Sequence, residues 1–158
     1  MSGRKRKPLP PPRDADDEVS LGVGRGALRT GDHAVFVYRS PEELLEQVVP
    51  YLCAGLTAGD KVVYVADDLD VTLVNAALRK AGVDVDGLTQ AGRLVVVAAT
   101  DAFFPGGRFD ADEAIAGVRA LLAQAHADGF RRVRFSVEMT YLLRDVPGSE
   151  RGVEFEAR

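Results

Sequence analysis

The stretch KVVYVADD, residues 61–68, decides the fold class of this chain. Its five consecutive residues VVYVA are apolar or aromatic, as in strands of a parallel sheet that helices cover on both faces. Asp67 and Asp68 close the run, and an amphipathic helix is predicted over residues 69–81 with Gly82 at its C-terminal cap. The apolar stripe of that helix consists of Leu69, Leu73, Val74, Ala77, Leu78 and Ala81.

The same alternation of strand and helix patterns continues on both sides of this stretch. Further strands are predicted at 33–38 (HAVFVY), 93–99 (RLVVVAA) and 131–139 (RRVRFSVEM). Amphipathic helices are predicted from the cap Ser40 to about Gly59, with Pro50 bending the axis, and from the cap Asp110 to about Gly129. Strands separated by helices of this length imply βαβ crossovers. We therefore predict an α/β domain of three layers, in which helices cover both faces of a mostly parallel sheet.

The two ends of the chain differ from this pattern. Residues 1–30 are basic and proline-rich, then acidic, then glycine-rich, which predicts a disordered tail before a domain at 31–158. After the last strand, a short helix is expected to break at Pro147, and another helix begins in SERGVEFEAR (149–158). Because no terminating glycine or polar cap follows it, we expect the fold to be incomplete at the C-terminus.

Composition excludes several classes of protein. The chain has 158 residues, is 46% apolar and carries a formal charge of −4, which suits one compact domain and indicates neither a nucleic-acid surface nor membrane attraction. No apolar run approaches the ~20 residues that span a bilayer, and no secretory signal is apparent, so a cytoplasmic protein is predicted. The single cysteine, Cys53, supports neither a disulfide framework nor a zinc site, and a packing role is expected.

Polar residues follow each predicted strand, and parallel strands bring their carboxyl ends to one rim. The candidates at this rim are Tyr38, Arg39, Asp67, Asp68, Asp101 and Glu138, with Arg108 in the long loop TDAFFPGGRFD (100–110). Individually, Asp68 could be a helix cap and Tyr38 a packing residue. Together, polar groups that converge at an apolar edge predict a ligand pocket, with the loop as its lid.

The rim lacks the motifs of catalysis. The sequence YRSPEE (38–43) stands where a phosphate-binding loop would need glycines and a lysine, and its glutamates would repel a polyphosphate. His33 and Ser40 lie at opposite ends of a strand, about 20 Å apart, and cannot form a dyad. Asp67, Asp68, Asp101 and Glu138 could hold Mg²⁺, but no second motif supports a metal. We therefore predict a protein that is not an enzyme and has no cofactor.

Four segments together resemble the MEDS domain family, typified by the repressor of dichloromethane metabolism. They are GDHAVFVYRSPEE (31–43), AGLTAGDKVVYVADD (54–68), FFPGGRFD (103–110) and VEMTYLLRDVPGSERGVEFEAR (137–158). The resemblance implies a cytoplasmic sensory module related in fold to the clock-protein and recombinase ATPases, without a working phosphate-binding loop. It further implies that His33, Tyr38, Asp67, Asp68, Glu138 and Arg144 occupy the positions of the family's motifs.

The resemblance also implies partners, and two departures from the family pattern qualify it. Such domains act with histidine-kinase-like, anti-sigma or DNA-binding modules, so a signal from a small molecule would pass to transcription, with no direct contact between this domain and nucleic acid. Val35 stands where the family commonly has a cysteine, which argues against thiol or metal chemistry at that position. The family's segment beyond FEAR is also absent.

Three functions remain open from the sequence. The first is a ligand-sensing domain at the strand rim. The second is a protein-interaction module with a vestigial pocket, including a homo-oligomer, because an unfinished fold leaves apolar surface exposed. The third is a degenerate nucleotide binder, which fold analogy alone supports.

Overall fold

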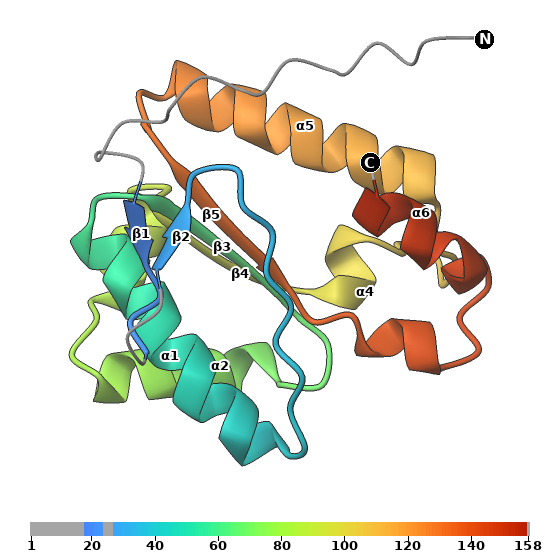
Figure 1. The fold of residues 1–158 in the computed structure, drawn as a ribbon, viewed down its shortest axis with the longest axis horizontal. Coiled ribbons are helices and arrows are strands. Elements are labelled where there is room, and N and C mark those ends of the chain that lie inside the picture. Colours follow the sequence, from blue (N-terminus) through green and yellow to red (C-terminus); the bar gives the residue numbers. More distant parts are fainter. Residues whose placement is uncertain (1–17, 24–26, 158) are drawn as a thin grey trace, which may run out of the picture.

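The computed structural model describes residues 18–23 and 27–157, and a three-stranded parallel sheet lies at its centre (Figure 1). The strand β3 (Lys61–Ala66) lies between β4 (Leu94–Ala98) and β5 (Val133–Val137), with both neighbours parallel to it. Val62 pairs with Leu94 on one side and Arg134 on the other. Since β3 is buried from Val62 onward, the prediction from its apolar run is confirmed.

One face of the sheet is covered by α1 (Pro41–Thr57), α2 (Val71–Lys80) and α3 (Val85–Gln90) (Figure 1). The helix α1 begins where predicted, because Ser40 Oγ accepts a hydrogen bond from the backbone N–H of Glu43. The main members of this first core are Leu44, Leu52, Val62, Tyr64, Val74, Leu78 and Leu94.

On the opposite face α5 (Ala111–Ala127) runs along the sheet, and α4 (Ala99–Ala102) and α6 (Gly152–Ala157) lie toward the carboxyl ends of the strands, with the short helices η2 (Thr140–Leu143) and η3 (Ser149–Arg151) beside them (Figure 1). The core on this side is rich in aromatic rings. They are Phe103, Phe104, Phe109 and Tyr141, with Phe135 and Phe155 packed against them. Helices on both faces of a parallel sheet confirm the predicted α/β class.

The predicted first strand is wrong. Residues 33–38 belong to no sheet, and no backbone hydrogen bond joins them to another residue within 18–23 or 27–157. The rings of Phe36 and Tyr38 stack 6.4 Å apart, as alternate residues on one side of an extended chain do. The β-branched and aromatic residues thus favour the extended backbone, but no strand in the described part of the chain pairs with it.

Smaller differences come from local pairing and exposure. Part of the predicted disordered tail forms a hairpin of β1 (Glu18–Ser20) and β2 (Ala27–Arg29), paired antiparallel, whereas residues 1–17 lie outside the described residues. Leu73, predicted in a buried stripe, is 45% exposed. The short helices α3 and α4 were not predicted, and α4 occupies the start of the expected loop at 100–110. Pro50 lies inside one continuous α1.

A buried ion cluster closes the amino ends of β3 and β5. Asp60, just before β3, accepts hydrogen bonds from Arg132 Nε at 2.8 Å and Arg134 Nη2 at 3.2 Å. Arg134 also donates Nη1 to the backbone carbonyls of Ser20 and Tyr51, which ties the hairpin and α1 to the sheet. Each buried charge in this cluster therefore has an opposite charge beside it.

Candidate functional site

Glu138, the residue after β5, joins the carboxyl ends of two strands. Its Oε2 accepts hydrogen bonds from the backbone N–H groups of Asp67 (2.9 Å), Asp68 (2.5 Å) and Leu69 (3.0 Å). Its Oε1 accepts the hydroxyl of Tyr64 at 2.5 Å. Because both oxygens already have protein donors, Glu138 shapes the turn between β3 and α2. That it contacts a ligand stays a prediction.

Tyr64, whose hydroxyl donates to Glu138, is a residue of the polar rim that the sequence analysis missed. Its ring is buried in the first core, and burial, followed by the hydrogen bond to Glu138, raises the pKa of its hydroxyl well above the ordinary value. A tyrosine within a buried valine run needs a partner for its hydroxyl. The tyrosine inside this apolar run therefore indicates, from the sequence alone, that a polar group lies near the end of the strand to accept its hydroxyl.

The two aspartates after β3 face different partners. Asp67 accepts a hydrogen bond from Thr140 Oγ1 at 2.5 Å and forms an ion pair with Arg144. Asp68 accepts the hydroxyl of Tyr38 at 3.0 Å. Burial, then this bond, raises the pKa of Tyr38 above its usual range.

The rim therefore brings together five of the nine predicted site residues, and the others lie around it. The assembled set is Tyr38, Asp67, Asp68, Glu138 and Arg144. His33 instead pairs with Glu156 of α6, with Nε2 and Oε2 3.0 Å apart. Arg39 and Arg108 are exposed, and Asp101 lies in α4 beside a depression.

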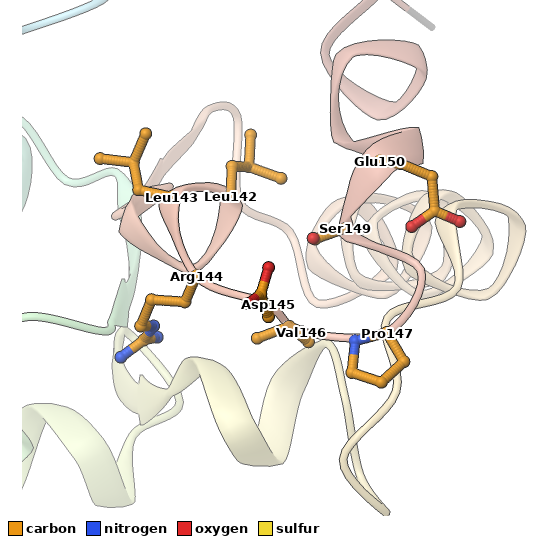
Figure 2. Close-up of a pocket in the computed structure, with 8 residues that line it drawn as sticks. All are labelled: Leu142, Leu143, Arg144, Asp145, Val146, Pro147, Ser149 and Glu150. Carbon is orange, nitrogen blue, oxygen red and sulfur yellow. The ribbon is translucent and has the colours of Figure 1, made fainter.

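The first of two open depressions beside the rim is formed by residues 142–147, 149 and 150 and has a volume of about 490 Å³ (Figure 2). Figure 2 shows Leu142 and Leu143 pointing to one side of the short helix η2 and Arg144 to the other. Arg144 there forms the ion pair with Asp67. Asp145 follows Arg144, and the chain then runs to Ser149. The lining of the depression therefore mixes apolar residues with polar ones: Leu142, Leu143, Val146 and Pro147 are apolar, and Arg144, Asp145, Ser149 and Glu150 are polar.

The second depression shares Asp145, Val146 and Pro147 with the first and has a volume of about 630 Å³. Its other wall is formed by Thr100, Asp101 and the chain from Phe104 to Gly107. Gly106 and Gly107 both have a positive φ, which the turn in this wall requires and which glycine adopts without strain. Both volumes fall in the range of small-molecule sites.

Metal binding has no support from the part of the chain that the structure describes. No group of at least three histidine, cysteine or acidic side chains lies close enough there to hold an ion. Asp67, one of the four carboxylates considered from the sequence, is occupied by Thr140 and Arg144. No described helix combines the length and the hydropathy that crossing a membrane needs.

These features define an α/β domain with a polar strand rim and no glycine-rich phosphate loop before its first long helix. The model of the family MEDS, the methanogen/methylotroph, DcmR sensory domain, matches residues 32–158. The chain belongs to this family of sensory domains, so the resemblance seen in the sequence is confirmed. Comparison with curated proteins and with solved structures found no match.

Proposed function

We propose that this domain senses a small molecule at its strand rim and relays binding to a partner protein, without making or breaking a covalent bond. The observation that carries the proposal is the shared wall of the two depressions. Residues 145–147 line both, and the preceding Arg144 forms the ion pair with Asp67 at the end of β3. A ligand in either depression would thus contact Asp145, the neighbour in sequence of Arg144, and the ion pair of Arg144 with Asp67 connects this wall to the end of β3.

The lining favours a ligand that donates hydrogen bonds. Asp101 and Asp145 supply carboxylate acceptors, and Thr100 and Ser149 supply hydroxyl groups. Phe104, Pro105 and Pro147 add apolar surface to the second depression. This combination suits a small molecule with amine or hydroxyl groups on a short carbon frame, such as an amino alcohol or a polyol.

The relay would use the contacts that surround Asp67. A ligand that draws Arg144 or Asp145 toward itself changes the ion pair with Asp67, whose backbone N–H is held by Glu138. Binding shifts the population of rim conformations only as far as the ligand prefers one of them. In the cytoplasm, the partner would be a histidine-kinase-like, anti-sigma or DNA-binding protein, and the response would reach transcription.

Thermal unfolding of the chain with a panel of primary amines, amino alcohols and polyols tests the proposal. A compound at 100 times its Kd should stabilise the domain by about 2.7 kcal/mol, which raises the Tm by roughly 5–10 °C. Asp145→Asn, which changes both depressions, should reduce that increase by more than half, and Asp101→Asn should do the same for a compound in the second depression. The control Glu46→Gln, at an exposed position of α1, should retain it in full.

Two results would count against this function. If no compound raises the Tm, or if the increase is the same in Asp145→Asn as in the unmodified chain, the depressions are not the sensing site. Mg-ATP belongs in the same panel, because an increase with Mg-ATP alone would favour the degenerate nucleotide binder instead.

A further inference from the structure

Residues 33–38, here called the strap, join elements that lie on opposite faces of the sheet. At one end of the strap, His33 Nε2 pairs with Glu156 Oε2 of α6 at 3.0 Å. At the other end, the hydroxyl of Tyr38 donates to Asp68 Oδ2 at 3.0 Å. The strap thus connects α6, beside the aromatic core, with the turn that leads from β3 into α2 on the other face.

Both anchor points belong to well-packed parts of the fold. The backbone N–H of Asp68 donates to the buried side chain of Glu138, the residue after β5. Glu156 follows Phe155, whose ring lies 5.4 Å from that of Phe103 in the aromatic core. The two contacts of the strap therefore attach one short segment to two separate cores.

The chain between the two contacts has little slack. The rings of Phe36 and Tyr38 stack 6.4 Å apart, as alternate residues of an extended backbone do. Directly after the strap, the backbone N–H of Arg39 donates to Glu43 Oε2 at 2.8 Å, which fixes the chain to the first turn of α1. An extended segment that is fixed in this way cannot absorb a movement of one contact without strain on the other.

We propose that the strap is a releasable connection that couples the turn after β3 to α6, so that release of either contact weakens the other. Once one contact is released, the strap samples more positions, which lowers the effective concentration of the remaining side chain at its partner. Coupling of this kind is reciprocal. A change at the rim that separates Asp68 from Tyr38 therefore loosens α6, and a change in α6 loosens the rim.

The two contacts are weak enough to open while the sheet stays folded. The side chain of His33 is 63% exposed, that of Glu156 is 32% exposed, and Asp68 lies at an exposed position. Exposed ion pairs and hydrogen bonds add little stability, and segments held by them open locally without global unfolding. The strap needs no ligand for this coupling, so it and the proposed ligand site can fail separately.

Hydrogen exchange of the full chain tests the coupling in one direction. Tyr38→Phe removes only the hydroxyl that donates to Asp68, at the end of the strap that does not touch α6. The amides of α6 should nevertheless exchange about two- to fivefold faster, the effect that the loss of one exposed contact gives. The amides of β3 should keep their exchange rates, which separates release of the strap from a general loss of stability.

Limited proteolysis tests the opposite direction. Chymotrypsin cleaves after aromatic residues, and the strap contains Phe36 and Tyr38. Glu156→Ala removes the partner of His33 without changing the strap itself. Cleavage within the strap should become about two- to fivefold faster, because cleavage of a locally opened segment follows the population of its open form.

Matched variants in α1 serve as controls. Tyr51→Phe and Glu46→Ala make the same kinds of substitution outside the two contacts of the strap, and both should leave α6 exchange and strap cleavage as in the unmodified chain. Unchanged α6 exchange in Tyr38→Phe, or unchanged strap cleavage in Glu156→Ala, would show that the two contacts act independently and would overturn the proposal. Equal effects in the controls would do the same.

Discussion

At the residue scale, Glu138 is the clearest case of a side chain whose role depends on atoms far away in the chain. A buried carboxylate is unfavourable unless donors surround it, and here three backbone N–H groups and the Tyr64 hydroxyl do so. The residue looks like a ligand contact when only its place after a strand is considered. Its partners show that it holds the turn after β3 and thereby positions Asp67 and Asp68.

Glu138→Gln should lower the free energy of unfolding by about 1–3 kcal/mol. The amide NH₂ replaces one acceptor oxygen with a donor, which leaves either the backbone N–H groups or the Tyr64 hydroxyl without an acceptor. Urea unfolding followed by circular dichroism gives the difference, with Glu46→Gln as a control expected to change little. Equal stability of the two variants would mean that these hydrogen bonds add no net stability.

At the element scale, one glycine sets how closely α1 packs on β3 and on the side chain of Arg134. A Cβ at Gly55 would lie 2.6 Å from Arg134 Nε and 2.9 Å from Val62 Cγ2. Arg134 has little freedom to move, since it bonds to Asp60 and two backbone carbonyls and lies over the Tyr51 ring at 4.5 Å. Gly55 thus allows the helix to pack over a buried arginine.

Gly55→Ala should destabilise the protein although alanine favours helix. Overpacking against Arg134 costs about 1–3 kcal/mol, more than the roughly 0.5–1 kcal/mol gained in helix propensity. Gly117→Ala in α5 is the matched control, because nothing lies within 4 Å of its added Cβ, and it should stabilise the protein by that propensity gain. Urea midpoints compare the two, and stabilisation by Gly55→Ala would show that Arg134 yields easily.

At the scale of the whole molecule, two cores lie on opposite faces of one sheet, and each contains a buried tyrosine. Tyr64 lies in the core beneath α1 and α2, and Tyr141 lies in the aromatic core beneath α5. Burial is the main cause that raises the pKa of both hydroxyls, followed by the Glu138 hydrogen bond for Tyr64 and by the charges of Glu156 and Asp67 for Tyr141. Both layers are therefore sensitive to alkaline pH.

Below pH ~10 the ionisation of these two tyrosines should not lower the free energy of unfolding. Above that pH the free energy of unfolding should fall as the pH rises. Above that pH the unfolded chain releases the tyrosine protons while the folded chain retains them, so each tyrosine lowers the free energy of unfolding by about 1.4 kcal/mol per pH unit. Urea unfolding between pH 8 and pH 11 measures the slope. Tyr141→Phe should make it shallower, and an unchanged slope would mean that Tyr141 ionises as easily in the folded protein.

Strand and helix positions were predictable where the signal is local. The buried run of β3, the Ser40 cap of α1 and the Asp110 cap of α5 all form as expected, because burial pattern and capping chemistry depend on neighbouring residues. The meeting of Asp68 and Glu138 at one rim was also predictable, since they follow the neighbouring parallel strands β3 and β5, whereas Tyr38 reaches the rim from a segment that forms no strand. The donors that occupy Glu138 were not, because they come from residues about 70 positions away.

The sequence by itself determined the class of the fold, the family and the edge of the sheet where polar groups gather, because periodicity and motif order are local properties of the chain. Only the tertiary structure decided which of those groups are occupied, where the two depressions lie, and that residues 33–38 pair with no described strand. A strand needs a neighbouring strand to satisfy its backbone hydrogen bonds, and a buried carboxylate needs hydrogen-bond donors to its oxygens. Both depend on distant parts of the chain, and no local pattern records them.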